Sequence, residues 1–265
     1  MSRSGGYVLV YKEQGKSTGN EVAAVTAITQ RLKLADIAAE VDSPQTGTFR
    51  IGLIGADAAT VSQAKQLLSY QGDLEFQIVA LRGGDDEVIS RFDGAKPAPP
   101  EDSKPGARWA TFDPDVTQFL DPGVVTRTSS GDKSEVLLLA DGEGVTGNHI
   151  TSAAVSQDES LSPCIMLSLN DEGAERMRLL SLSDVPDGAQ AVPRMLAIVL
   201  DGKVITAPFI RGKMGGHVQI TGKFKTEEAQ AIVSVLQAGR FPIALQPQPV
   251  SEVKVEPGQP LPALP

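Results

Sequence analysis

The apolar and polar positions of the first part of the chain alternate between strand and helix periods. Strands are predicted over residues 7–11, 48–54 and 74–81, where β-rich residues or strict alternation occur. Residues 21–34 predict a helix with one apolar face, made by Val22, Val25, Ile28 and Leu32. Asp57 can cap a second helix, and Gly72 lies just past the expected end of that helix.

The second part repeats this order of elements. Strands are predicted over residues 135–140, 163–169, 194–200, 203–210, 218–220, 241–245 and 250–255. Asn170 can cap a helix that runs to about residue 182, and Thr226 can cap another that stops at Gly239. Asp201 and Gly202 form a strong two-residue signal for a β-hairpin turn.

We interpret both parts as the order strand–helix–strand–strand–helix–strand. This is the split βαβ, ferredoxin-like arrangement, and it predicts an α+β chain of two modules with helices on one face of antiparallel or mixed sheets. We expect the first module over residues 1–82 and the second over residues 135–247. A strand returning at about residues 248–257 should join the first module, because it carries valines that need a buried partner, namely Val250, Val253 and Val255.

The segments between and after the modules lack this periodicity. Residues 83–134 are expected to form a linker or an irregular insertion, because residues 94–106 are rich in proline and glycine. The tail, residues 258–265, is also proline-rich and is expected to be extended and mobile.

Composition narrows the classes of function. The chain of 265 residues has a formal net charge of −9, which disfavours nucleic acid as a partner because phosphate backbones are bound by cationic surfaces. One cysteine, Cys164, and two histidines make neither a disulfide nor a cysteine–histidine metal cluster. No run of residues approaches the ~20 apolar positions of a membrane span. We therefore expect no metal and no cofactor.

One motif is typical of enzymes. Gly142, Gly144 and Gly147 form a G-x-G-x-x-G pattern directly after a predicted strand, as dinucleotide sites do. However, the residues that follow, 148–156, are a short β-branched run and a poor helix for holding a pyrophosphate. His149 and His217 lack the nucleophile and the orienting acid that a catalytic base needs. We interpret the chain as non-enzymatic and keep a nucleotide-dependent enzyme that uses residues 142–147 as the alternative.

Several short motifs occur together in an order that resembles the first periplasmic domain of the SecD family, the accessory subunits of bacterial protein export. The first module carries an I-x-x-R helix at Ile28–Arg31 and an L-E-F strand at Leu74–Phe76. The remaining motifs, which include D-G-K-V, G-G, Q-I-T-G and L-N-x-E-G-A, contain Thr146, Gly147, Asn170, Gly173, Asp201, Gly202, Lys203, Pro208, Gly215, Gly216, Gln219, Gly222 and Gly239. Asp36 departs from the pattern of the family, which usually has glycine at this position. The turn after the first helix can therefore differ from the turn of the family.

The resemblance implies a function and a location. The first module would be a base and the second a head that holds translocating polypeptide, with the motif residues structural or substrate-holding and none of them catalytic. The chain would be a soluble fragment of a membrane protein on the extracytoplasmic, periplasmic face of the bacterial inner membrane. Membrane helices absent from this chain would carry the proton flow and meet a SecF-like subunit and the Sec translocon. A free-standing periplasmic peptide- or protein-binding module is the second alternative.

Overall fold

The computed structural model describes residues 5–15, 19–92, 106–117, 120–129, 131–139, 144–183, 194–210, 212–257 and 259. The proline-rich stretch 94–105, Gly142 of the glycine motif and the expected tail other than Gln259 lie outside these residues. The chain is α+β and divides into a first unit, residues 1–72 with 225–265, and a second unit, residues 73–224.

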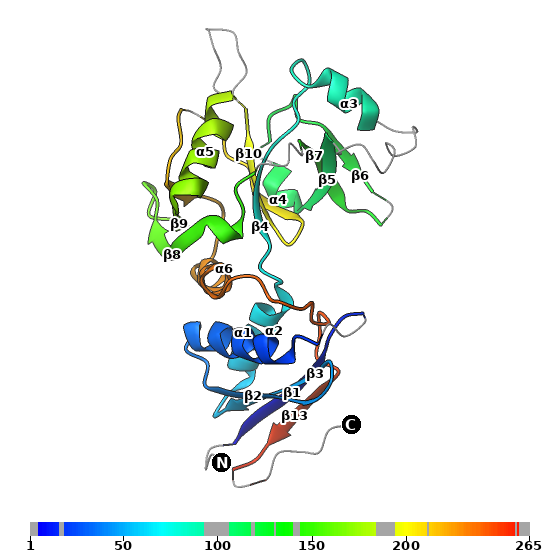
Figure 1. The fold of residues 1–265 in the computed structure, drawn as a ribbon, viewed down its shortest axis with the longest axis vertical. Coiled ribbons are helices and arrows are strands. Elements are labelled where there is room, and N and C mark those ends of the chain that lie inside the picture. The colour runs from blue at the N-terminus through cyan, green and yellow to red at the C-terminus, as the bar shows by residue number, and fades with distance from the viewer. Residues whose placement is uncertain are drawn as a thin grey trace. The chain divides into compact units, whose positions relative to one another are not determined.

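The first unit is a helix layer on an antiparallel sheet. The sheet has the order β13-β1-β3-β2, with β1 at Gly6–Lys12, β2 at Ala39–Gln45, β3 at Thr48–Ile54 and β13 at Ser251–Val255. Its helices are α1 (Glu21–Leu34), α2 (Ala58–Ser69) and α6 (Thr226–Ala238). Figure 1 shows α1 and α2 over one face of the sheet, and α6 packs against both of them.

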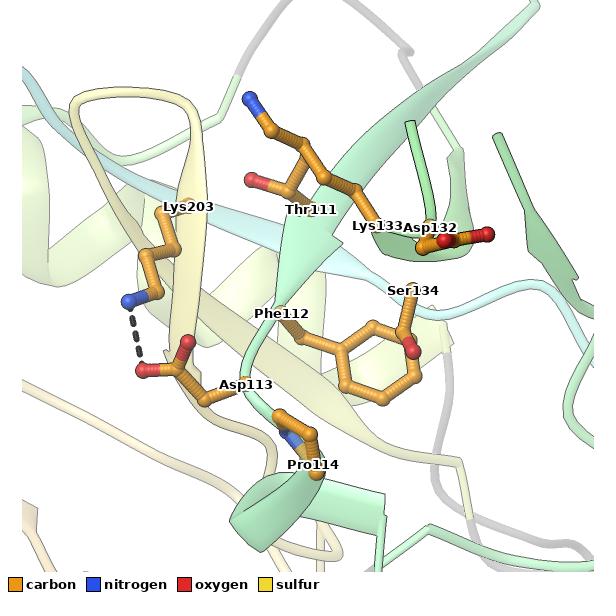
Figure 2. A pocket seen from close by; sticks show the side chains of 8 residues that line it. All are labelled: Thr111, Phe112, Asp113, Pro114, Asp132, Lys133, Ser134 and Lys203. Atoms are coloured by element: carbon orange, nitrogen blue, oxygen red, sulfur yellow. Dashed lines mark ion pairs between the residues drawn. The ribbon is translucent and has the colours of Figure 1, made fainter. Parts of the chain in front are cut away.

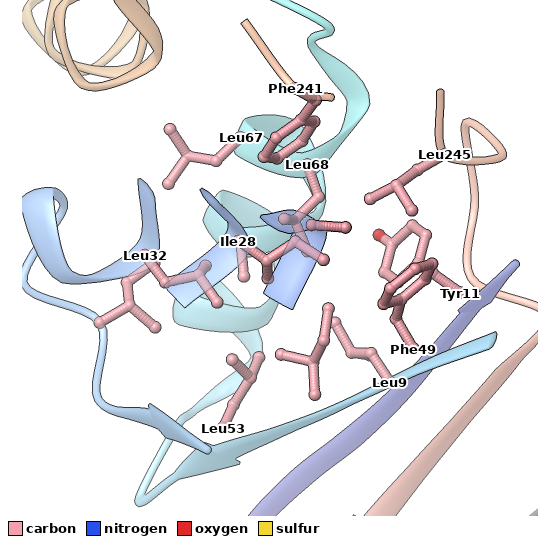
Figure 3. Packing of buried hydrophobic residues seen from close by; sticks show 14 of the residues in the cluster. Leu9, Tyr11, Ile28, Leu32, Phe49, Leu53, Leu67, Leu68, Phe241 and Leu245 are labelled. Carbon is pink, nitrogen blue, oxygen red and sulfur yellow. The ribbon is translucent and has the colours of Figure 1, made fainter. Parts of the chain in front are cut away.

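One apolar cluster joins the sheet and the helices of this unit (Figure 3). Its buried side chains come from both stretches of the chain and include Leu9, Tyr11, Ile28, Leu32, Phe49, Leu53, Leu67, Leu68, Phe241 and Leu245. At about 25 cal/mol per Å² of apolar surface removed from water, such a cluster is the main favourable contribution to folding. Asp57 caps α2 as predicted, since its carboxylate accepts the Thr60 N–H at 2.8 Å, and this hydrogen bond lowers the pKa of Asp57.

A buried arginine lies within the same unit. Arg31 on α1 is fully buried, and its guanidinium donates to the backbone carbonyls of Leu67 at 3.2 Å, of Tyr70, and of Gly239 at 2.8 Å. Its guanidinium carbon also lies 3.5 Å from the centroid of the Phe241 ring. Arg31 therefore ties the end of α2 to the segment that follows α6, although these segments are far apart in sequence.

Several expectations for the first unit differ from the structure. Helix α6, expected in the second module, belongs to the first unit because Ala231 and Val235 are buried in its core. The strand expected over residues 241–245 is an irregular segment with an isolated bridge from Glu13 to Leu245. On α1, Val22 is 83% exposed, whereas Ala24 and Arg31 face inward. Ile28 and Leu32 are buried and Val25 is partly buried, as predicted, so of the predicted apolar face only Val22 points away from the core.

The interactions that hold the returning strand, β13, also differ from the expected ones. β13 pairs antiparallel with β1 over residues 251–255, so a strand does return at the expected place. However, Val250 and Val253 are 44% and 39% exposed. Main-chain hydrogen bonds to β1, rather than burial of the valines, hold this strand in the sheet.

The second unit contains two sheets as far as the structure describes it. One has the order β4-β10-β11-β5-β7-β6 and the other the order β12-β9-β8. The strands are β4 (Leu74–Ile78), β5 (Ala107–Phe112), β6 (Thr126–Thr128), β7 (Ser134–Leu139), β8 (Ile150–Gln157), β9 (Pro163–Leu169), β10 (Leu196–Leu200), β11 (Lys203–Thr206) and β12 (His217–Ile220). The helices are α3 (Asp86–Phe92), α4 (Pro114–Thr117), α5 (Asp171–Ser183) and the 3₁₀ turn η1 (Gly147–His149).

This arrangement is not the single sheet expected for residues 135–247. β7 pairs with β5 and β6, whereas β9 pairs with β8 and β12, so the expected strands fall into different sheets. β4, expected in the first module, pairs antiparallel with β10. Within the expected irregular insertion 83–134, residues 107–112 and 126–128 are strands. Long-range pairing, which local periodicity does not specify, decides these assignments.

The turns at the ends of two elements use left-handed backbone. Asp201 and Gly202 have φ values of 52° and 78° between β10 and β11, which confirms the predicted hairpin with a turn of type I′ character. Asp36 has φ 56° after α1. This is the backbone region that glycine favours and aspartate tolerates, so aspartate can form the turn that follows α1.

The hairpin turn gives a first prediction. A Cβ at Gly202 or at Gly215 would meet no atom within 4 Å, but only Gly202 has a left-handed φ. We expect Gly202→Ala to lower the free energy of unfolding by about 1 kcal/mol through backbone strain alone. Gly215→Ala is the matched control and should change it by less than about 0.5 kcal/mol. Equal urea midpoints for the two variants would contradict the turn.

The buried arginine gives a second prediction. Arg31→Met keeps much of the volume but removes the donors to the carbonyls of Leu67 and Gly239, and we expect it to destabilise the chain by about 2–4 kcal/mol. Arg50→Met is the control, because Arg50 pairs with the half-exposed Asp42 carboxylate on the surface of the same unit. That change should cost at most about 1 kcal/mol. Urea unfolding monitored by far-UV circular dichroism measures both, and similar losses would refute the role of Arg31.

Candidate functional site

The described residues show no metal-binding cluster. No group of three or more histidine, cysteine, aspartate or glutamate side chains among them is arranged to hold a metal ion. Across the same residues, no helix is both long enough and apolar enough to span a membrane. The candidates for a functional site are the motif residues and the hollows of the second unit.

The first group of motif residues surrounds a buried histidine. The Thr146 N–H donates to His149 Nδ1 at 3.0 Å, and the Asn170 N–H donates to the His149 carbonyl at 2.8 Å. Asn170 caps α5 as predicted, because its side-chain oxygen accepts the Gly173 N–H at 2.8 Å. Gly147 begins η1 beside them. His149 thus acts as a backbone cap in this structure, with its Nδ1 used as an acceptor.

The structure also explains two glycines near this histidine. A Cβ at Gly173 would lie 2.5 Å from the Cβ of His149, which is closer than two non-bonded carbon atoms can approach. The Gly216 carbonyl accepts the Leu169 N–H at 2.7 Å, and a Cβ at Gly216 would lie 3.4 Å from that of Ala174. Gly173 is needed for close packing, and Gly216 continues the pairing of the short sheet.

The dinucleotide alternative lacks its structural context. The residues after Gly147 form η1 and then strand β8 rather than a helix. The Val145 carbonyl is taken by the Phe76 N–H at 2.9 Å. A pyrophosphate is held by free N–H groups at the start of a helix, and residues 144–157 present a strand instead.

The second group of motif residues is the β10–β11 hairpin. The Asp201 carboxylate accepts the Asp73 N–H at 2.8 Å, and the Asp201 N–H donates to the Asp73 carbonyl at 2.8 Å. Lys203 forms an ion pair with Asp113 at 2.5 Å. Asp201 therefore fixes the first residue of the second unit in addition to forming the turn.

Lys203 and Asp113 border a hollow of about 340 Å³ (Figure 2). Its other lining residues are Thr111, Phe112, Pro114, Asp132, Lys133 and Ser134. Figure 2 shows the Lys203 ammonium turned toward the Asp113 carboxylate, while the side chain of Lys133 extends away from that pair. Because Lys203 already has an acidic partner, this hollow favours a structural ion pair over anion binding.

The third group borders a larger groove, which we call the head groove. Its volume is about 710 Å³, and its lining residues are Asp158, Ser160, Ser162, Thr206, Ala207, Pro208, Phe209, Thr221, Gly222 and Lys223. Three separate segments supply them: the β8–β9 turn, the end of β11 with the residues that follow it, and the segment after β12. Apolar atoms, hydroxyl groups and one charged side chain of each sign share this surface, so it suits an uncharged or mixed ligand better than a phosphate.

The remaining motif residues lie apart from the groove. Gln219 on β12 contacts the buried Cys164, with its Nε2 atom 3.4 Å from the sulfur. Gly239 ends α6 in the first unit with φ 75°, and its carbonyl accepts Arg31. His217 begins β12 and is exposed. The motif residues therefore do not form one site, and Pro208 and Gly222 are the two that line the head groove.

Comparisons with known proteins agree over this region. The family model for the SecDF P1 head subdomain matches residues 124–243. The protein translocase subunit SecD of Acidaminococcus fermentans is 35% identical to this chain over 118 residues, which cover 43% of this chain and 27% of that protein. The chain spans less than a third of the length of the curated relatives that it matches.

Solved structures share the fold. The crystal structure of SecDF in its super-membrane-facing form matches 97% of this chain and 32% of its own chain, with a TM-score of 0.64 and 22% identity. A structure of SecDF described as a membrane component that enhances protein export matches 90% of this chain and 96% of its own chain, with a TM-score of 0.58 and 22% identity. At this identity the likeness concerns the fold.

The packing around His149 gives a third prediction. Gly173→Ala should destabilise the chain by about 1–3 kcal/mol, because the overlap with His149 outweighs the gain in helix propensity from alanine. Gly216→Ala should change the free energy of unfolding by less than about 1 kcal/mol, since its nearest neighbour is at ordinary contact distance. Thermal unfolding compares them, and a Gly173→Ala variant as stable as Gly216→Ala would show that α5 and His149 are not tightly packed.

Proposed function

We propose, from the membership of residues 124–243 in the SecDF P1 head family, that this chain is the extracytoplasmic domain of a SecD-like subunit of protein export. In this proposal, the second unit, whose residues 124–224 lie within that match, works as the head, which holds translocating polypeptide on the periplasmic side of the bacterial inner membrane. Helix α6 also lies within the match but packs in the core of the first unit. The family match over the head is the observation that carries the proposal.

The chemistry of the described residues supports binding rather than catalysis. The head groove offers apolar atoms beside hydroxyl groups, which suit the side chains and the main chain of an extended polypeptide. A subunit that assists translocation must release its cargo, so we expect micromolar or weaker affinity, about −8 kcal/mol at most. The net charge of −9 should favour basic and apolar segments over acidic ones.

The first unit would serve as the base. Its order of elements, β1-α1-β2-β3-α2 with β13 as the returning strand, is consistent with a ferredoxin-like module, and we propose that assignment. Partner contacts with a SecF-like subunit and the Sec translocon, and coupling to proton flow, would reside in membrane helices outside this chain. Movement of the head relative to the base would convert changes in those helices into a pull on the polypeptide.

The motif residues would then divide by role. Pro208 and Gly222 border the groove and are the proposed substrate-holding members. The others would shape the backbone around it: they cap α5, form the hairpin turn or end α6. None of them is proposed to be catalytic.

Site-specific crosslinking in translocating membranes tests this function. A photo-crosslinker at Phe209 in the full-length protein should capture nascent polypeptide, because Phe209 lines the head groove. Val22, which is 83% exposed in the first unit, is the matched control and should capture little. Crosslinks to substrate confined to Val22, or none at either position while export proceeds, would defeat the proposal.

A further inference from the structure

The tip of the β8–β9 hairpin carries an exposed leucine in strained backbone. Leu161 has φ 59° and is 74% exposed. Among the described residues, the other non-glycine positions with positive φ are Asp36, Asp132 and Asp201. Aspartate tolerates this conformation because its short side chain bonds to nearby backbone, whereas leucine gains nothing comparable. The choice of leucine here therefore opposes local stability.

Hydrogen bonds within the turn impose this conformation. The Asp158 carboxylate accepts the N–H groups of Ser160 at 2.8 Å and Ser162 at 2.9 Å. The Leu161 N–H donates to the Asp158 carbonyl at 3.0 Å, and the Asp158 N–H donates to the Ser162 carbonyl at 2.9 Å. None of these bonds needs an apolar side chain at position 161, so glycine or asparagine would fit the turn better.

The same turn forms one wall of the head groove. Asp158, Ser160 and Ser162 line the groove together with Pro208 and Phe209, which are half-buried. Leu161 is not itself part of this lining, but it lies between two lining residues, Ser160 and Ser162, in a turn held by these hydrogen bonds. A strained, exposed apolar residue at such a place points to a contact made with a binding partner.

We propose that Leu161 is a substrate-contacting residue, which together with the head groove receives an apolar side chain of an extended polypeptide. This inference rests on the proposed function and assigns its contact site. The groove volume of about 710 Å³ is within the ~300–1,000 Å³ of small-ligand sites, which corresponds to a few residues of chain.

The composition of the groove selects polypeptide over lipid. Its hydroxyl groups, carried by Ser160, Ser162, Thr206 and Thr221, can donate to carbonyls and accept from amides of a main chain. Among the described residues that line it, the charged side chains are one carboxylate, Asp158, and one ammonium, Lys223, and not the cluster of cations that anionic headgroups require.

Fluorescence anisotropy with the purified chain tests the assignment. The probe is a labelled, uncharged 12-residue peptide with alternating leucine and serine, and a serine-only peptide is its counterpart. Leu161→Asn should weaken binding of the leucine peptide at least fivefold, and should keep or raise the Tm because asparagine tolerates positive φ. Leu179→Gln removes another exposed leucine, on α5, and should leave binding unchanged.

The outcomes separate the possible explanations. Unchanged affinity in Leu161→Asn, or an equal loss in Leu179→Gln, would overturn the assignment, as would failure of the unaltered chain to bind the leucine peptide. Binding to phosphatidylglycerol vesicles that depends on Leu161, without peptide binding, would overturn it in favour of a lipid contact. Crosslinking from Phe209 in membranes decides the proposed function separately, since it does not require Leu161.

Discussion

The buried guanidinium of Arg31 links two stretches of the chain that are far apart in sequence and together form the first unit. Residues 1–72 and 225–265 are separated in sequence by the whole second unit, and they must associate for the first unit to fold. Arg31 donates to carbonyls at the end of α2, in the first stretch, and to the Gly239 carbonyl after α6, in the second. The partial negative charge at helix C-termini offsets part of the cost of burying this cation. The apolar cluster shared by α1, α2 and α6 also buries side chains from both stretches, so the polar bonds of Arg31 and the apolar core join the same segments.

The same constraint fixes the chain where it passes into the second unit. Arg31 also donates to the Gln71 carbonyl at 3.3 Å, and Gln71 in turn donates to the Ile243 carbonyl at 3.0 Å. Asp73, two residues later, is held within the second unit by Asp201. Gly72, with φ 91°, is the one residue between these two anchors. Each unit therefore fixes its own side of the crossing by specific hydrogen bonds to the backbone.

Local signals in the sequence predicted the elements better than their partners. β9 and the Asp201–Gly202 turn were found because alternation and turn chemistry are local. β2 and β8 were missed: β2 is a charged edge strand, and β8 carries small and hydroxyl side chains. The sequence does not indicate which unit α6 belongs to, because the apolar face of this helix would fit any complementary core. The burial of Arg31 cannot be predicted from the motif that contains it, since a cation on a helix normally faces water.

The candidate site could not be predicted from the sequence either, because it also depends on long-range pairing. Its glycines and its proline were visible in the sequence, but the groove is assembled from three segments whose proximity depends on pairing between distant strands. The motif residues mostly shape backbone: Gly173 allows close packing with His149, and Gly202 allows a left-handed turn. Contact with a polypeptide of varied sequence needs only apolar surface and main-chain partners, which ordinary side chains supply. The motifs thus identify the scaffold, whereas Leu161 and Phe209, the residues proposed to meet the polypeptide, lie outside them.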